Sequence, residues 1–308
     1  MTLVVARTEG GKVHVTSDTL VTKINGERFS YDKCIVKAVL VNVQCCICFA
    51  GNVDAANKAI SHLIDKNYNC INKILSYLEK IHNKYNQSVD FGVITNIDEE
   101  LSLHSLKSGE ALTNVKQFWL GEHFNEFQIK FGEFPEDTPL KDKMNQSMIS
   151  LIQDGNINAI GGFDLSISSD NESFQFEDEN GKRPISGLAY DFRVHHSITG
   201  PQIITFEKAG ECKPIKGGTD DSISVFSSTN PYYPGAGIHY KHAKNGYLFC
   251  PHLRIKLGQP ELVLEPFVYT NVDPECFLEK ITSSYGIGLK GFVVGDEGRL
   301  TLHNEKSA

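Results

Sequence analysis

Hydrophobic and polar positions alternate in two short segments at the start of the chain. TLVVART and KVHVTSDTLV are rich in β-branched residues and flank Gly10-Gly11, a pattern that predicts a β-hairpin. CIVKAVLV and CCICFAG follow and predict a second pair of strands. The apolar run that contains this second pair is broken by Lys37, Asn42 and Gln44, so it is too short for a membrane span and is typical of buried strands.

The periodicity changes after the second pair of strands. VDAANKAISHLIDK and CINKILSYLEKIHNKY place apolar residues three and four positions apart, which predicts two amphipathic helices. Asn52 and Asn69 stand just before them and are suitable N-cap residues. The pattern therefore predicts two hairpins followed by two helices.

The next part of the chain repeats the alternation of strands and helices. SVDFGVITN and LSLHSL predict strands, KQFWLGEH predicts a strand that leads into the helix HFNEFQIKFGEF, and PLKDKMNQSMISLIQDG predicts a further helix before the strand GGFDLSISS. This order suits an α+β fold in which sheets are stacked between layers of helices.

Residues 181–308 have a different pattern, in which short apolar strands, GYLFCPHLRIKL among them, are separated by Gly and Pro. The acidic stretch SSDNESFQFEDENGKRP, just before and into this part, predicts a hairpin with an NG turn or a linker. PECFLEKITSS predicts one helix, and GIGLKG predicts a turn. This part of the chain is either a second β-rich module or an elaboration of the layers before it.

Charge and cysteine usage narrow the class of protein. The 308 residues carry a formal net charge of −8, and Lys and Arg are not clustered, which argues against nucleic acid or an anionic membrane as the main partner. Eight cysteines lack the spacing of a secreted disulfide framework, and the N-terminus lacks the pattern of a targeting segment. We therefore expect a cytoplasmic protein.

Four motifs, in order, resemble one family. They are Thr2 at the N-terminus, SDT around Asp18, FAGNVDAA around Gly51, and SLIQDGNINAIGGFDLSIS around Gly161-Gly162. Over roughly residues 2 to 170, this order resembles the proteasome β-subunit and its bacterial ring-protease relatives, which are N-terminal-nucleophile hydrolases. The resemblance implies a four-layer αββα sandwich over residues 1–180, with residues 181–308 as a β-rich extension.

The chemistry of such a site follows from Thr2. Removal of Met1 would free an α-amine with an ordinary pKa of about 7.7–8.0, and this amine can take the proton of the threonine hydroxyl. The resemblance implies that Asp18 and a lysine support the site, with Lys33 as the first candidate and Lys37 as the second. It also implies that the Gly51 N–H stabilises an oxyanion. No cofactor or metal is expected.

The sequence departs from the family at two supporting positions. Active members usually carry Gly-Ser-Gly where this chain has Leu120-Gly121-Glu122-His123, and an Arg-Asp where this chain has Asn156-Ile157-Asn158. Two functions therefore remain open. One is a threonine-type hydrolase that cleaves peptide or small amide bonds, and the other is a catalytically inactive proteasome-like protein that builds an assembly or binds a partner.

The resemblance also implies partners: a peptide or protein substrate, further copies of the chain in a homo-oligomer, and an unfoldase that could serve a ring. Two other patterns in residues 181–308 bear on possible sites. His239, His242, Cys250 and His252 do not match an established zinc-finger spacing, and STNPYYPGAGIHY is either a rigid loop that lines a groove or a packed connection.

Overall fold

The computed structural model describes most of the chain. It covers residues 2–21, 34–97, 100–153, 157, 160–169, 173–177, 192–194, 206–208, 223–241, 244–294 and 300–304. These residues form a mixed α+β fold with antiparallel sheets, which confirms the predicted fold class at that level.

The first sheet is built on the N-terminal hairpin. Its order is β10-β9-β2-β1-β8, and every neighbouring pair is antiparallel. The strands are β1 (Leu3–Glu9), β2 (Lys12–Asp18), β8 (Gln117–Gly121), β9 (Asp164–Ser169) and β10 (Phe174–Phe176). Strands far apart in the sequence therefore meet beside the chain's first residues.

The second sheet has the order β3-β4-β5-β6-β7 and is also antiparallel. Its strands are β3 (Ala38–Asn42), β4 (Cys45–Gly51), β5 (Val89–Ile97), β6 (Glu100–Lys107) and β7 (Glu110–Leu112). This order follows the sequence because each strand is joined to the next by a hairpin or, between β4 and β5, by two helices.

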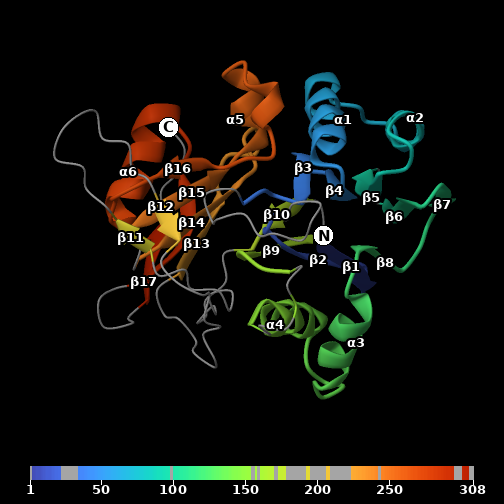
Figure 1. Ribbon diagram of the computed structural model, residues 1–308, viewed down its shortest axis with the longest axis horizontal. Helices are drawn as coiled ribbons and strands as arrows, with labels where there is room; N and C mark the ends of the chain where they lie inside the picture. Colours follow the sequence, from blue (N-terminus) through green and yellow to red (C-terminus); the bar gives the residue numbers. More distant parts are fainter. Residues whose placement is uncertain are drawn as a thin grey trace.

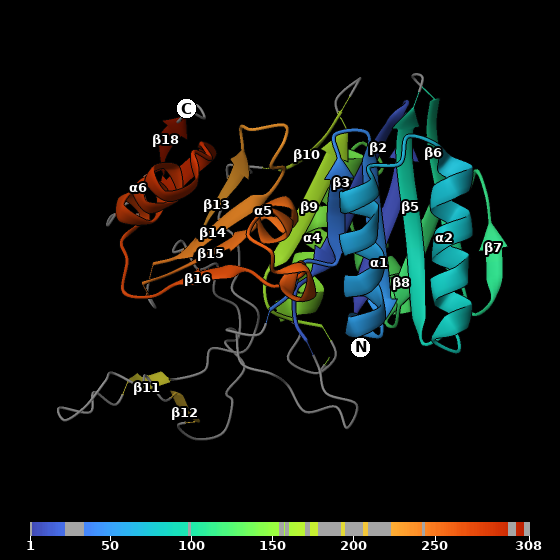
Figure 2. The same ribbon diagram turned by 90° about the horizontal axis from the view of Figure 1, so that it is seen from above.

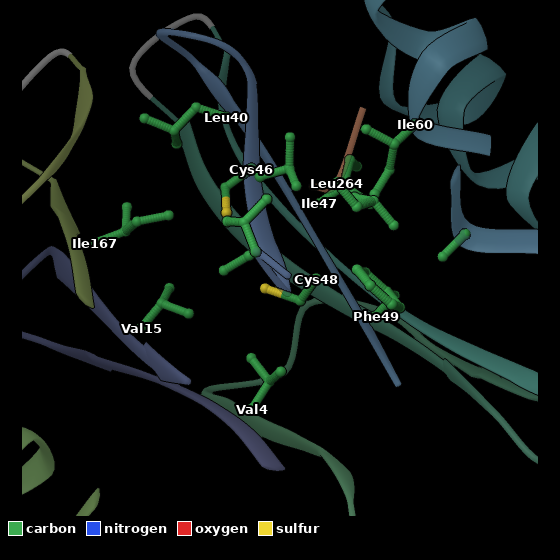
Figure 3. Packing of buried hydrophobic residues seen from close by; sticks show 14 of the residues in the cluster. Val4, Val15, Leu40, Cys46, Ile47, Cys48, Phe49, Ile60, Ile167 and Leu264 are labelled. Carbon is green, nitrogen blue, oxygen red and sulfur yellow. The ribbon is translucent and has the colours of Figure 1, made fainter. Parts of the chain in front are cut away.

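The two sheets lie between two pairs of helices (Figure 1). The pair α1 (Val53–Lys66) and α2 (Ile71–Lys84) covers the second sheet, and the pair α3 (Phe124–Gly132) and α4 (Leu140–Gln153) covers the first. Side chains of β4 show the layering directly: Cys46 and Cys48 point toward the first sheet, whereas Phe49 points toward α1 (Figure 3). The period of two along a strand supplies both interfaces.

Helix α1 shows how local sequence sets an element. Asn52 caps its N-terminus, since the side-chain oxygen accepts a hydrogen bond of 3.0 Å from the Ala55 N–H. The helix ends where Asn67 adopts the left-handed conformation and donates its N–H to the Leu63 carbonyl. Between these caps, Ala and Ile side chains form the buried face against the sheet.

A third sheet lies beside the layers, at the left in Figure 2, and we call residues 223–304 the C-terminal module. Its order is β16-β15-β14-β13-β17-β18. The strands are β13 (Ile223–Ser228), β14 (Ala236–Tyr240), β15 (Asn245–Phe249), β16 (Phe267–Tyr269), β17 (Leu289–Val294) and β18 (Leu300–Asn304), and the helices are α5 (Pro251–Lys256), η2 (Pro260–Leu262) and α6 (Pro274–Tyr285). A small separate pair joins β11 (Phe192–Val194) to β12 (Phe206–Lys208).

The C-terminal module has a core of its own and also shares one with the layers. Phe226, Leu248 and Phe277 are buried between its sheet and α6. By contrast, Val225 and Leu264 belong to the same hydrophobic cluster as the residues between the first two sheets. The module therefore packs against the layers, while the division at residue 180 stays a prediction.

Most predicted elements are confirmed, and four predictions are wrong in detail. The turn predicted for GIGLKG extends only to Gly288, because β17 begins at Leu289. β3 begins at Ala38, four residues after the predicted Cys34. The N-cap of α2 is Cys70 and not Asn69. Residues 251–256 form α5 and not a strand, because Pro251 at the first helical position starts a helix. The predicted NG turn at residues 180–181 lies outside the described residues.

Within the described ranges, every helix is too short or too polar to cross a bilayer.

Two of the histidines that were considered as zinc ligands hydrogen-bond to backbone carbonyls. His239 Nε2 lies 2.8 Å from the Val272 oxygen, and His252 Nε2 lies 2.8 Å from the Val41 oxygen. Burial lowers the pKa of both histidines, and these hydrogen bonds partly oppose it.

Acidification should therefore weaken the fold. The unfolded chain takes up protons at these histidines near pH 6.5, but folded His239 and His252, whose pKa is lowered, do so only at lower pH. Stability is thus lost as the pH falls below about 6.5, by up to about 1.4 kcal/mol per pH unit for each such histidine. Urea unfolding at pH 7, 6 and 5 measures this loss. His239→Gln should lose less stability than the wild type over this range, and equal losses would contradict the assignment.

Candidate active site

Asp18 is the centre of the candidate site. It is the last residue of β2 and is fully buried, with 0% of its surface exposed. One carboxylate oxygen, Oδ1, accepts hydrogen bonds from the Thr2 hydroxyl at 3.1 Å, the Leu3 N–H at 3.1 Å and the Lys37 ammonium at 2.8 Å. The other, Oδ2, accepts from the Gly161 N–H at 3.3 Å. A buried carboxylate needs such partners, because burial without them is costly.

Thr2 is held from two sides, directly before β1. Its hydroxyl donates to Asp18, and its carbonyl oxygen accepts a hydrogen bond of 3.0 Å from the Glu122 N–H, just past the end of β8. Gly121 makes this approach feasible. It has φ +87°, and a Cβ at this position would lie 1.9 Å from the Thr2 carbonyl oxygen. The Thr2 side chain is therefore fixed between β2 and β8, with 6% of the residue exposed.

Lys37 supplies the positive charge. Its ammonium lies 2.8 Å from Asp18 Oδ1 and donates to the Leu20 carbonyl at 2.7 Å, and the residue is 2% exposed. Burial lowers the pKa of Lys37, and the attraction and hydrogen bond of Asp18 oppose this shift. An ion pair this deeply buried is tolerated only because each charge has an opposite charge and hydrogen-bond partners beside it.

Two consecutive glycines close the site from the β9 side. The Gly161 carbonyl accepts the N–H groups of Thr19 and Leu20 at 3.2 and 3.0 Å, while its own N–H reaches Asp18. Gly162 has φ +75°, and a Cβ there would lie 2.5 Å from the Thr19 hydroxyl oxygen. The backbone of this turn therefore packs directly against the end of β2.

Gly51 ends β4 in a conformation that favours glycine. Its φ is +100°, and a Cβ would lie 2.3 Å from the Ser88 carbonyl oxygen. It stands two residues after Phe49, whose N–H donates to the Lys37 carbonyl at 3.0 Å. Gly51 is therefore linked through β4 to the segment that carries Lys37.

The structure brings together Thr2, Asp18 and Lys37, the second of the two candidate lysines. Lys33 and Asn158 lie outside the described residues, so the role given to Lys33 stays a prediction. The supporting serine of the family is absent from this chain at Glu122, and the Glu122 backbone holds Thr2 instead.

Sequence reasoning missed the backbone groups that complete the site. They are the Leu20 carbonyl, which accepts from Lys37, and the Gly161 N–H, which donates to Asp18. It also missed that Gly121 is required by the close approach of Thr2. The sequence did show a glycine at the end of a predicted strand. A glycine by itself, however, does not indicate which distant segment of the chain packs against it.

Cavities also occur outside the candidate site. A cavity of about 680 Å³ is lined by Arg7, Phe131, Lys143 and neighbouring residues, at the end of β1 opposite Thr2. In the described part of the chain, His, Cys, Asp and Glu side chains do not gather in groups of three that could hold a metal ion. The loop after β13 lines a second cavity of about 360 Å³ together with Phe174 and Lys290.

Comparisons with known proteins find similarity at the level of structure. No protein-family model matches the chain, and no curated protein matches it by sequence. Among solved structures, the chain is similar to the Anbu (Gly-1) mutant from Hyphomicrobium sp. strain MC1, with a TM-score of 0.46 and 16% identity over 58% of this chain and 87% of that chain. Anbu is a bacterial proteasome-like N-terminal-nucleophile hydrolase, the class that the sequence motifs resemble. At 16% identity and a TM-score of 0.46, the similarity assigns no activity and no residue role to this chain.

Asp18→Asn should destabilise the protein strongly. The neutral amide would leave the Lys37 ammonium buried without a countercharge, which typically costs about 3–5 kcal/mol of unfolding free energy. Urea unfolding measures this loss, and Lys66→Met is the matched control because the Lys66–Asp65 pair is exposed and should matter by at most about 1 kcal/mol. The double variant Asp18→Asn/Lys37→Met should lose less than the sum of its single variants. Equal effects of Asp18→Asn and Lys66→Met would refute the buried pair.

Gly51→Ala should destabilise the protein by about 1–3 kcal/mol, because alanine at φ +100° is strained and its Cβ would overlap the Ser88 carbonyl. Gly132→Ala is the control, since Gly132 ends α3 with open space around it and alanine favours a helix. Thermal unfolding of both variants gives the comparison. A Gly51→Ala variant as stable as Gly132→Ala would show that Gly51 is not conformationally required.

Proposed function

We propose that this protein is a threonine-type hydrolase that cleaves peptide or other amide bonds through an acyl-enzyme on Thr2. The observation that carries the proposal is the buried set of Thr2, Asp18 and Lys37, in which one carboxylate oxygen binds both the hydroxyl and the ammonium. An ion pair that served only to stabilise the fold would not need a threonine hydroxyl bonded to the same carboxylate oxygen.

The arrangement of layers supports the same proposal. Helices, two antiparallel sheets and helices are stacked in the order expected of the αββα sandwich of N-terminal-nucleophile hydrolases. Thr2 precedes the first strand, and Asp18 ends the second, so one hairpin carries both groups. Fold alone does not assign an activity, and the proposal therefore rests on the site.

The proposed reaction begins with removal of Met1, which exposes the α-amine of Thr2. The amine, directly or through a water, takes the hydroxyl proton as the threonine oxygen attacks the carbonyl carbon of the scissile amide. The C–N bond then breaks, the leaving amine takes the proton, and the acyl group remains as an ester on Thr2. A water molecule hydrolyses this ester and restores the hydroxyl and the amine.

Asp18 and Lys37 are proposed to prepare the nucleophile and not to exchange protons with the substrate. Asp18 orients the hydroxyl, and the ammonium keeps the local potential positive, which favours the developing negative charge on oxygen. The Gly51 N–H is proposed to donate to the oxyanion of the tetrahedral intermediate, since glycine allows a substrate to approach the backbone closely.

A catalytically inactive proteasome-like protein is the second candidate function, and two observations favour it. Thr2 is only 6% exposed, and Glu122 offers no serine hydroxyl where active relatives carry one. In this case, the same surfaces would bind a partner or build an assembly. A homo-oligomer and an unfoldase partner belong to the ring-protease interpretation and stay predictions.

Intact mass spectrometry tests the proposal. The wild-type protein should have lost Met1, and a peptide epoxyketone, which reacts with both the hydroxyl and the amine of a terminal threonine, should add once per chain. Thr2→Ala should abolish the adduct. Thr8→Ala is the matched control, because Thr8 lies near the far end of β1, the strand that follows Thr2, and its hydroxyl bonds to the Lys116 carbonyl. This variant should leave the adduct unchanged.

Two outcomes would refute hydrolase activity. Met1 would be retained, so that the amine stays an amide, or a free Thr2 would remain unmodified by the epoxyketone. Either result would favour the inactive protein.

A further inference from the structure

The lysine segment, residues 35–37, is held by three different parts of the protein. The Ile35 N–H donates to the Thr19 carbonyl at 3.0 Å, the Val36 N–H donates to the Leu264 carbonyl at 3.0 Å, and the Lys37 carbonyl accepts from the Phe49 N–H at 3.0 Å. The first contact comes from Thr19, the residue directly after β2, and the third comes from β4. The second comes from the C-terminal module, more than two hundred residues further along the chain.

Asn57 fixes the loop that provides this contact. Its side-chain amide donates to the carbonyls of Pro260, at 3.1 Å, and Glu261, and its oxygen accepts the Leu264 N–H at 3.2 Å. The residue is 9% exposed on the buried side of α1. The NH₂ group and the oxygen of the Asn57 side chain are therefore both bonded to the backbone of residues 260–264. These bonds are satisfied together only when the loop lies in this one position.

The Leu264 side chain anchors the same loop in the core. It is 1% exposed and lies beside Ile47 and Ile60, on the α1 side of the second sheet (Figure 3). One residue of the C-terminal module thus packs between α1 and β4 while its carbonyl bonds to Val36. The hydrogen bond from Val36 to Leu264 is buried, since both residues are almost inaccessible to solvent. Water therefore does not compete for it as it does for a hydrogen bond on the surface.

We propose that Asn57 and Leu264 are positioning residues, through which the C-terminal module holds Lys37 against Asp18. The inference rests on the proposed function for its effect on catalysis, but the contact itself can be tested separately. Because a displacement of about 1 Å can reduce a reaction rate about a hundredfold, release of Val36 should weaken the site without removing any of its groups. The C-terminal module is then part of the site and not an appendage.

Amide hydrogen exchange tests the contact without requiring activity. In Asn57→Ala, the Val36 amide should exchange at least tenfold faster than in the wild type, while the Ile167 amide in β9 should be unchanged. Ser61→Ala is the matched control: the Ser61 hydroxyl bonds to the Pro260 carbonyl from the exposed side of the same helix, but it does not contact Leu264, and its loss should change Val36 exchange less than twofold. If Asn57→Ala does not fold, Asn57→Ser, whose hydroxyl is too short to replace the amide, takes its place.

The epoxyketone reaction tests the consequence for the site. Asn57→Ala should lower the maximal rate of Thr2 modification at least tenfold, with the half-saturating concentration of the epoxyketone unchanged. A variant that was merely less stable would lower the rate only in proportion to its folded fraction, which urea unfolding of the same variant measures, so a tenfold loss of rate in predominantly folded protein reports on the site. Ser61→Ala should react at the wild-type rate.

The outcomes separate this inference from the proposed function. Unchanged exchange at Val36, or faster exchange with an unchanged rate of Thr2 modification, would overturn the inference while leaving the hydrolase intact. A wild-type Thr2 that does not react would refute the hydrolase, and Val36 exchange alone would then decide whether the C-terminal module holds the lysine segment.

Discussion

The buried carboxylate of Asp18 is the interaction on which the site depends. It accepts hydrogen bonds from the Thr2 hydroxyl, the Leu3 amide, the Lys37 ammonium and the Gly161 amide. These donors come from three separate parts of the chain, so the carboxylate at the end of β2 is satisfied only when the start of β1, the lysine segment and the turn before β9 are all in place. Without them, a buried charge would be strongly unfavourable.

This dependence explains why the surrounding backbone is so tightly specified. Gly121 lets the Thr2 carbonyl, and Gly162 lets the Thr19 hydroxyl, approach to distances that a Cβ would block. Leu264 of the C-terminal module holds the lysine segment through Val36, and Asn57 on α1 fixes the loop that carries Leu264. A buried ion pair adds little net stability by itself, and in this protein its importance lies in the one arrangement that it allows.

Sequence patterns predicted the local elements well, and they failed where distant contacts override local preference. The N-terminal hairpin, the capped helix after Asn52 and the buried strands before it were all readable from apolar spacing. The start of β3 was not, because residues 34–37 look apolar enough for a strand but are held by separate partners on three sides. Residues 251–256 were also misread, since a short amphipathic segment fits either a strand or a helix.

By itself, the sequence determined which residues can carry the chemistry: a threonine behind Met1, an aspartate at a strand end, lysines around the start of the next predicted strand, and glycines at the turns. Only the tertiary structure decided that Lys37 pairs with Asp18, that backbone groups of Leu20 and Gly161 complete the site, and that the C-terminal module takes part. The reason is physical. Periodicity reports which face of an element is buried, but the partner of a buried charge depends on contacts between segments far apart in the chain.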